Sequence, residues 1–367
     1  MNSTSEQPIK LRCYNELLIS IIVPIYNAEK HLTRCLDSII VSANHSIDTK
    51  LIEVILIDDG STDKSYEIAE DYCRKYPWMR LLHQENEGPS SARNKGLDKA
   101  TGSYTGFIDC DDTIDKSYFS IFFKSIESEP DIIVFGYKRI SLGSEDRTYC
   151  PRPQTHNKQS DYLLSHVSND RELFWYPYTK WFKSELIKSI RFNENMRLGE
   201  DTIFNLQAVS NAQYIIRIPI VLYFYHETLG SLSSSNYKPN LLENMEQHFS
   251  QRLEVNRATN SGLSKEAWSD IYNYYIFHIL PWLITNSTHL DRKNQLDELI
   301  RIRNSDFVNI CFTHGKKLGN SSKQILIQAL FRANLLKSLQ HSLSITLASN
   351  KIHKRRSFKN VVVQKVG

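Results

Sequence analysis

Three carboxylates stand within four positions of the sequence, at Asp109, Asp111 and Asp112, directly behind a short apolar run. Their mutual repulsion opposes full ionisation unless a positive charge lies beside them. If an extended strand continues through them, the side chains of Asp109 and Asp111 point to the same side. Hard oxygen ligands of this kind suit Mg2+ or Mn2+, which usually share their ligands with substrate phosphates. The pattern predicts a divalent metal site; the alternative is a solvated acidic turn in which Asp112 caps the next helix.

Two earlier apolar runs end in residues that suit the recognition of a nucleobase. Tyr26 offers a flat ring on which a base can stack, and Asp59 can accept a hydrogen bond from an imide N–H such as that of uracil. The alternative is structural, with Asp58 or Asp59 capping the helix that begins near Asp63 and Gly60 turning the chain. One such turn alone does not decide between the two.

A cationic candidate, Arg93, lies in the segment SSARNKG, where Ser90 or Ser91 is expected to cap a short helix. A guanidinium placed near a nucleotide recognises phosphate or carbonyl oxygens well. Taken without its neighbours, Arg93 is more simply explained as a surface residue that pairs with Glu85 or Glu87; within this segment, the nucleotide contact is favoured.

A second acidic pair, Glu200 and Asp201, follows about 90 residues after Asp111 and precedes the helical pattern IFNLQAVSNA. A carboxylate at such a place can take a proton from a hydroxyl group. The structural alternative is that Asp201 caps the helix while Glu200 interacts favourably with the helix dipole.

The elements that must position these residues are short β-rich runs that alternate with helical periodicity. The runs cover residues 19–26, 51–59, 79–84, 104–112 and 131–140. Between them, one helix is expected to bury Leu32, Leu36, Ile39 and Ile40, and the next to bury Tyr66, Ala69 and Cys73. Near-continuous apolar strands indicate a parallel sheet covered on both faces, which is an α/β doubly wound pattern. Ligands bind beyond the carboxyl ends of such strands, where the candidate residues lie.

The remainder of the chain is less regular. An aromatic-rich stretch follows, with a hairpin expected over residues 218–234, and the chain reads as helical from about Leu241 onward. Trp175, Tyr178 and Trp181 form an aromatic group that is more typical of a core than of a sugar platform. The six cysteines show no spacing typical of zinc sites or disulfide frameworks, which favours reduced thiols.

Three ordered segments carry a family resemblance: SIIVPIYNAEKHLTRCLDSI, EVILIDDGSTDKS and NEGPSSARNKGLDKATGSYTGFIDCDD. Together they resemble the inverting nucleotide-sugar glycosyltransferases with the GT-A fold, known as glycosyltransferase family 2. The resemblance covers residues 18 to 235 and implies a Rossmann-like, mainly parallel sheet flanked by helices. It is specific for the family and much less specific for the substrate.

The resemblance implies a role for each candidate residue. Pro24 and Tyr26 would line the base and ribose, Asp59 would read the base, Arg93 would lie beside the nucleotide, Asp109 would approach the ribose, and Asp111 would bind the metal. The acidic pair would supply the catalytic base, with Asp201 favoured over Glu200. His226 would be a third metal ligand or a phosphate contact, although a lone histidine in a hairpin is more often structural. An inverting transfer needs one base, because the metal stabilises the departing diphosphate.

The expected organisation is an N-terminal extension (1–17), a GT-A domain (18–237) and a helical, basic C-terminal region (238–367). Within the domain, residues up to about 140 would bind the nucleotide sugar and residues 141–237 the acceptor. The implied enzyme moves a monosaccharide from a nucleotide sugar, first of all a UDP-sugar, to a hydroxyl of a glycan or lipid-linked glycan. Bacterial lipopolysaccharide core, O-antigen and capsule are the candidate products.

Two other functions fit the sequence less well. A non-catalytic nucleotide-sugar-binding subunit of a polysaccharide assembly complex is disfavoured because both acidic pairs are present. A nucleotidyltransferase needs a Gly-rich loop near the first strand, and PIYNAEKHL offers none.

The charge is unevenly distributed. The net charge of +4 argues against a nucleic-acid partner for the whole chain, whereas the Lys and Arg residues after residue 300 face a single acid, Asp306. Lys354, Arg355, Arg356 and Lys359 are expected either to contact an anionic inner membrane or to form a solvated or protein-docking tail. No apolar stretch is long enough for a membrane span, so a cytoplasmic location, peripheral to the inner membrane in the first case, is expected.

Overall fold

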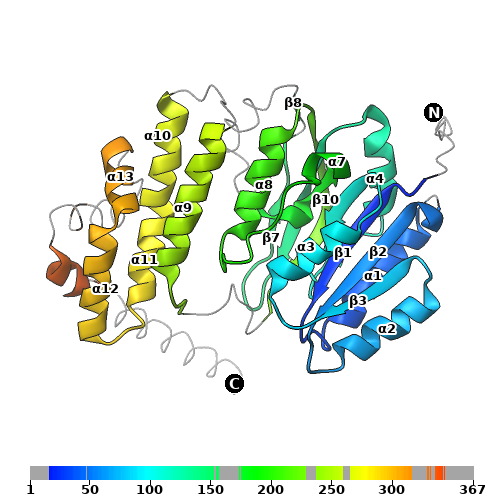
Figure 1. The fold of residues 1–367 in the computed structure, drawn as a ribbon, viewed down its shortest axis with the longest axis horizontal. Coiled ribbons are helices and arrows are strands. Elements are labelled where there is room, and N and C mark those ends of the chain that lie inside the picture. Colours follow the sequence, from blue (N-terminus) through cyan, green and yellow to red (C-terminus); the bar gives the residue numbers. More distant parts are fainter. Residues whose placement is uncertain are drawn as a thin grey trace, which may run out of the picture. The chain divides into compact units, whose positions relative to one another are not determined.

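The computed structural model describes residues 16–46, 48–152, 154–156, 173, 175–228, 237–258, 265–315, 329, 331, 335–341 and 343. The chain divides into two compact units (Figure 1). The first comprises Met1–Leu229 with Gln251–Ser261, and the second comprises Gly230–Ser250 with Gly262–Gly367. The domain boundary expected after residue 237 stays a prediction.

The first part of unit one is a parallel sheet. Its strands, in the spatial order β3-β2-β1-β4, are β1 (Ile19–Ile25), β2 (Ile52–Asp59), β3 (Met79–Gln84) and β4 (Tyr104–Phe107). Every residue of β1 is buried, because helices cover both faces of the sheet. The expected parallel α/β sheet is confirmed for these strands, and their carboxyl ends share one edge.

The sheet continues beyond β4 as a mixed sheet, ten strands in all among the described residues. Its further strands are β5 (Thr113–Ile114), β6 (Ile132–Ile140), β7 (Arg147–Tyr149), β8 (Gln154–His156), β9 (Lys180–Lys183) and β10 (Ile215–His226). Strand β9 lies between β4 and β6 and is antiparallel to both. Strand β10 runs parallel to β6 as one long strand, and the second arm of the expected hairpin lies outside the described residues.

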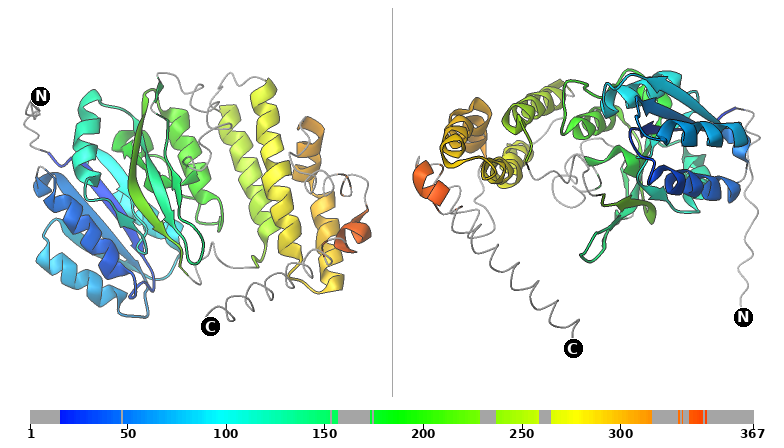
Figure 2. Two further views of the ribbon diagram at one scale, coloured as in Figure 1. Left: turned by 180° about the vertical axis from the view of Figure 1, so that it is seen from behind. Right: turned by 90° about the horizontal axis from the view of Figure 1, so that it is seen from below.

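Helices lie on both faces of this sheet (Figure 2). They are α1 (Leu32–Asn44), α2 (Ser65–Lys75), α3 (Pro89–Lys99), α4 (Tyr118–Ser125), α7 (Ser184–Ile187) and α8 (Glu200–Asn211). Right-handed crossovers place α1 and α2 on one face, and α3, which returns the chain past β1, on the other. The apolar stripe predicted for α1 is confirmed, since all four of its residues are buried. The stripe predicted for α2 is wrong at Tyr66, which is 37% exposed and packs edge-on against His83 of β3 with ring centroids 5.7 Å apart.

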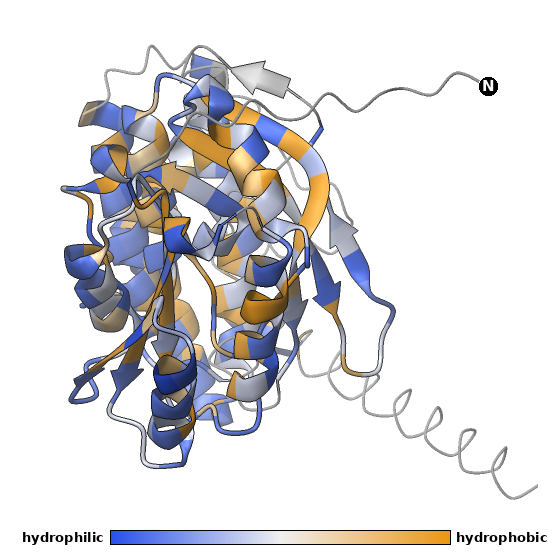
Figure 3. Cartoon of the chain, turned by 90° about the vertical axis from the view of Figure 1, so that its right-hand side faces the viewer, coloured by the Kyte–Doolittle hydropathy of each residue, from blue (hydrophilic) through white to orange (hydrophobic). Residues whose placement is uncertain are grey.

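Aromatic side chains fill the two layers between sheet and helices. Neighbouring residues of β9 point to opposite faces: Trp181 packs edge-on against Tyr118 at 4.9 Å, and Phe182 packs against Phe204 at 5.7 Å. Trp181 and Tyr178 are almost completely buried, so they belong to the core. Figure 3 shows the hydrophobic residues concentrated along the strands.

Unit two is helical, as the sequence predicts. Its elements are α10 (Lys265–Tyr274), a π-helical turn (Tyr275–Ile279), α11 (Leu280–Ser287), α12 (Arg292–Asn304) and α13 (Asp306–His314), with the first turns of α9 (Leu241–Ala258). Among the helices that the structure describes, none is both long and apolar enough to cross a membrane. The basic cluster at residues 354–359 lies outside the described residues, so membrane contact by the tail stays a prediction.

Candidate functional site

Two helices begin at the sheet edge where the candidate residues lie. Helix α3 follows Gly88 and helix α8 follows Gly199, each glycine with a φ of +91°. Glycine takes up this left-handed conformation without a steric penalty. Neither helix has a side-chain cap, so the caps expected from Ser90 or Ser91 and from Asp201 are wrong. The side chains of the first turns are instead available for other contacts.

Arg93 of α3 connects the two acidic segments. Its Nη2 donates to Asp109 Oδ1 at 3.0 Å, and its Nη1 donates to Asp201 Oδ1 at 3.1 Å. Glu200 Oε1 lies 3.7 Å from Nη1, and the guanidinium lies over the Phe192 ring at 5.3 Å. Arg93 is only 6% exposed. The surface pairing with Glu85 or Glu87 is therefore wrong, and part of the positive charge that the acidic turn needs comes from this arginine.

Burial and the neighbouring charges affect the pKa values of Glu200 and Asp201 differently. Burial alone would lower the pKa of Arg93, but the charges of Asp201, Asp109 and Glu200 outweigh it and raise that pKa. Burial, helped by the charge on Asp201, raises the pKa of Glu200 to about 8. Burial also raises the pKa of Asp201, whereas Arg93 opposes the rise. Glu200 is therefore mostly protonated at neutral pH, whereas the contact with Arg93 favours the ionised form of Asp201.

The acidic segment is a turn and not the end of a strand. Strand β4 ends at Phe107, and the Asp112 N–H donates to the Asp109 carbonyl oxygen at 3.1 Å. The expectation that strand alternation places Asp109 and Asp111 on one side is wrong for this reason. Asp112 is completely buried and accepts hydrogen bonds from residues of β10, so it does not cap the next helix.

Side chains of helix α1 hold this turn in place by contacting its backbone atoms. Arg34 Nη2 donates to the Asp111 carbonyl oxygen at 2.6 Å, and the Cys35 thiol lies 3.6 Å from the Asp109 carbonyl oxygen. One turn further, Ser38 Oγ accepts from the Ile114 N–H at 3.1 Å. No pattern in the sequence indicates these contacts, because the polar positions of α1 resemble an ordinary solvent-facing side.

The carboxylates of the turn supply some, but not all, of the ligands that a divalent cation needs. Burial, followed by the charge of Asp109, raises the pKa of Asp111, which is the condition that a bound cation relieves. Asp111 Oδ2 accepts from Thr228 Oγ at 3.1 Å, and His226 Nε2 lies 2.9 Å from Thr113 Oγ. Within the described part of the chain, no three His, Cys, Asp or Glu side chains form a ready-made metal site. Asp109 and Asp111 suit an ion that takes one or two carboxylates and completes its shell with phosphate and water.

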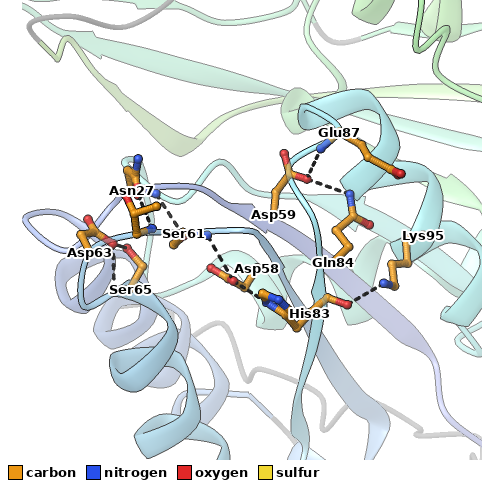
Figure 4. Close-up of polar contacts among 11 residues, drawn as sticks. Asn27, Asp58, Asp59, Ser61, Asp63, Ser65, His83, Gln84, Glu87 and Lys95 are labelled. Carbon is orange, nitrogen blue, oxygen red and sulfur yellow. Dashed lines mark hydrogen bonds and ion pairs between the residues drawn. The ribbon is translucent and has the colours of Figure 1, made fainter.

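The base-recognition candidates lie at the ends of β1 and β2 (Figure 4). Tyr26 is 48% exposed, whereas Pro24 is buried within β1. Asp59 is 3% exposed: its Oδ1 accepts from Gln84 Nε2 and the Glu87 N–H, and its Oδ2 accepts from the Gly88 N–H at 2.9 Å. A carboxylate has about four acceptor sites, so one remains for a base N–H.

Asp58 and Asp59 have different partners. Asp58 is completely buried, and its Oδ2 lies 2.8 Å from Nδ1 of His83 and accepts from the Ser61 N–H at 3.3 Å. Neither carboxylate caps α2, so that alternative is wrong; Asp63 accepts from the Ser65 N–H instead. Figure 4 shows the two carboxylates pointing to different partners, with Asp58 joined to His83 and Asp59 joined to Gln84 and to Glu87 in the turn before α3.

Two further residues of α3, Asn94 and Gly96, determine how this helix packs against its neighbours. Asn94 exchanges hydrogen bonds with the Phe192 backbone at 2.8 and 2.9 Å, which holds the segment before α8 against α3. A Cβ at Gly96 would lie 2.5 Å from Ile22 Cγ2, so glycine allows α3 to pack closely on β1. The segment Arg93–Gly96 therefore joins the two halves of the site.

Comparisons with known proteins agree with this arrangement. The profile of the family described as "Glycosyl transferase family 2" matches residues 20–193. The uncharacterised glycosyltransferase EpsJ of Bacillus subtilis (strain 168) is 34% identical over 278 residues, which cover 74% of this chain and 78% of that protein. The minor teichoic acid biosynthesis protein GgaB of the same organism is 35% identical over 187 residues, 50% of this chain but only 20% of that protein.

The fold also has a close match among solved structures. TarS of S. aureus (residues 1–349, in complex with UDP) superposes with a TM-score of 0.65 at 20% identity, covering 91% of this chain and 92% of that one. The mixed sheet with flanking helices is therefore the GT-A fold, followed by a helical region. The extent of the match to EpsJ and the family profile lead to one conclusion: this chain is a glycosyltransferase and belongs to glycosyltransferase family 2.

Proposed function

We propose that this glycosyltransferase transfers a monosaccharide from a nucleotide sugar, in the first instance a UDP-sugar, to a hydroxyl of a glycan acceptor, with inversion at the anomeric carbon. The observation that carries the proposal is the double contact of Arg93 with Asp109 and Asp201. It brings a carboxylate suited to proton abstraction next to the acidic turn at the carboxyl edge of the sheet.

Asp201 acts as the base in this proposal. Its Oδ1 accepts a hydrogen bond from Arg93. Its Oδ2 has no hydrogen-bond donor among the described residues, so Oδ2 is available to take the proton of the acceptor hydroxyl. As that proton moves to Asp201, the acceptor oxygen attacks the anomeric carbon from the face opposite the nucleotide. Glu200, largely protonated near neutral pH, stays beside Arg93 without competing for its charge.

The donor would lie along the sheet edge. Tyr26 would stack on the base and Asp59 would accept its imide N–H, while Pro24 shapes this end of β1 from within the strand. Asp109 would approach the ribose through the carboxylate oxygen that does not face Arg93.

The diphosphate would lie next to the acidic turn. Asp109 and Asp111 would hold a divalent cation, Mg2+ or Mn2+, which when bound offsets the charge of the leaving diphosphate. Thr228 orients the Asp111 carboxylate, and His226 would contact a phosphate or the cation once its bond to Thr113 is released.

The biological context is proposed from the relatives. GgaB is named for minor teichoic acid biosynthesis, and the matched TarS structure contains UDP. We propose that this chain likewise builds a bacterial cell-surface polymer, such as a teichoic acid, capsule, O-antigen or lipopolysaccharide core, and that it does so in the cytoplasm.

Donor binding should require both a nucleotide diphosphate and a metal. We expect one of UDP, GDP or dTDP to raise the melting temperature in the presence of Mn2+ or Mg2+, with UDP the most effective, and the shift to disappear on adding EDTA. Binding by the folded state alone stabilises it in proportion to the logarithm of ligand concentration over Kd. Thermal shift measurements over these nucleotides and their sugar conjugates test this. No metal-assisted shift with any of them would contradict the proposed function.

Transfer should also depend on pH through Asp201. Burial raises the pKa of this carboxyl, so it becomes protonated at a higher pH than an exposed aspartate, whose pKa is about 3.9. Only the ionised form accepts a proton, so the rate should be full above the raised pKa and fall as the pH decreases through it. A plot of log kcat against pH, with saturating donor and metal, should show a limb of slope one. A rate that stays constant down to the pKa of a free aspartate would contradict the assignment.

A further inference from the structure

The third carboxylate of the acidic turn, Asp112, differs from its neighbours in position and in partners. It is completely buried, whereas Asp109 and Asp111 are partly exposed. Its Oδ2 accepts from the Tyr223 hydroxyl at 2.6 Å, and its Oδ1 accepts from the His226 N–H at 2.7 Å. Because both oxygens are directed into the protein, Asp112 is not placed to bind a ligand.

Tyr223 extends this contact to the start of the turn. Its hydroxyl donates to Asp112 and accepts from the Asp109 N–H at 3.1 Å. The ring is completely buried and stacks on the Tyr178 ring, with centroids 4.2 Å apart and an interplanar angle of 10°. A phenol held in this way cannot rotate its oxygen away from the turn, since a ring with its neighbours packed around it has one orientation.

These contacts join two segments that are distant in sequence. Asp112 and Tyr223 connect the backbone at Asp109 with the backbone at His226, and two residues further Thr228 donates to Asp111 Oδ2 at 3.1 Å. Both segments contain residues that would face the diphosphate. A displacement of either one would therefore separate groups that must reach the same ligand.

We propose that Asp112 and Tyr223 are a positioning pair that sets the distance between the acidic turn and the His226–Thr228 segment, and so determines the affinity for a metal-bound nucleoside diphosphate. This inference rests on the proposed function. The pair touches neither the ligand nor the reacting atoms; it acts through the backbone of Asp109 and His226. A buried carboxyl group that bonds to both a tyrosine hydroxyl and a backbone N–H suits this task, because losing either contact would leave a buried polar group without its partner.

Tyr223→Phe tests the proposal, with Tyr178→Phe as the matched control. The first substitution removes the hydroxyl that links Asp112 and Asp109; the second removes a hydroxyl from the adjacent ring of the same stack. Titration calorimetry at a temperature well below unfolding gives the Kd for UDP with Mn2+, and for uridine without metal. We expect Y223F to weaken metal-assisted UDP binding about tenfold. Asp112 and the Asp109 N–H would lose their shared partner, so the acidic turn would no longer be held in place. Uridine binding should weaken much less than UDP binding, because Tyr26 and Asp59 at the ends of β1 and β2 would hold the base and only Asp109 approaches the ribose. Y178F should change neither Kd more than twofold.

The outcomes separate positioning from a purely structural role. If Y223F lowers the melting temperature but leaves the Kd for UDP with Mn2+ unchanged, the positioning role is rejected. Asp112→Asn, which keeps the side-chain volume and loses one acceptor, should show the same selective loss and replaces Y223F if that variant does not fold. If neither variant folds, the pair determines folding and the proposal is also rejected. If the wild-type protein itself binds no nucleoside diphosphate with metal, the proposed function fails first.

Discussion

Replacement of Asp201 by asparagine is expected to slow sugar transfer by about 10²–10⁴-fold, the usual contribution of a general base. Asparagine retains the shape of the side chain and can still accept a hydrogen bond from Arg93, but it cannot take up the proton of the acceptor hydroxyl. Binding of the nucleotide with metal should persist, because Asp109 and Asp111 remain in place. Release of the nucleoside diphosphate during transfer, measured at saturating donor, gives the change in kcat.

Glu200→Gln is the control for Asp201→Asn. Since burial and Asp201 raise the pKa of Glu200 to about 8, this side chain is mostly neutral near pH 7, and glutamine resembles its neutral form. We expect E200Q to lose at most about tenfold in kcat, far less than D201N. The opposite order would assign the base to Glu200. Equal activity of D201N and the wild type would remove the acidic pair from catalysis, and a wild-type protein that binds UDP-sugar without turnover would favour the non-catalytic alternative.

Replacement of Arg93 by methionine should have the largest effect on stability. Methionine keeps much of the buried volume but leaves Asp109 and Asp201 without their shared cation, and removing one partner of a buried ion pair costs about 3–5 kcal/mol. The loss should appear as a lower midpoint in urea unfolding of the first unit. Transfer should fall too, because the base is no longer held.

The matched control for Arg93→Met is Arg191→Met. Arg191 pairs with Asp98 at 2.6 Å on the surface, where such a pair contributes about 0–1 kcal/mol. A double variant, R93M with D201N, should recover part of the lost stability, because it removes one of the uncompensated charges. A loss in R93M no larger than that in R191M would show that Arg93 does not hold the two acidic segments together.

The sequence predicts the parallel part of the fold well. The runs at 19–26, 51–59 and 79–84 match β1, β2 and β3 to within one residue, because strands buried on both faces need nearly continuous apolar residues. Parallel strands also bring their carboxyl ends to one edge. The sequence alone therefore predicts that Asp59 and Asp109 lie at the same edge.

Other features depend on partners that are distant in sequence. Strand β9, with the sequence KWFK, has charged ends and no apolar run, so its position follows only from pairing with β4 and β6. The acidic turn resembled the end of a strand because apolar residues precede it; the buried Asp112 requires Tyr223, 111 positions later, and this partner is not evident from local pattern. The partners of Arg93 were missed for the same reason, since Asp201 lies 108 positions away.

The place of β9 between β4 and β6 has a consequence for how the chain is made. On the ribosome, residues up to Ile140 emerge first, yet the middle of their sheet stays open until Lys180–Lys183 arrive to fill it. About 40 further residues, or several seconds of translation, are therefore needed before β9 can pair. During this time, one edge of β4 and one edge of β6 stay unpaired. A gene cut at that point would encode a fragment prone to aggregate, not a free-standing nucleotide-binding module.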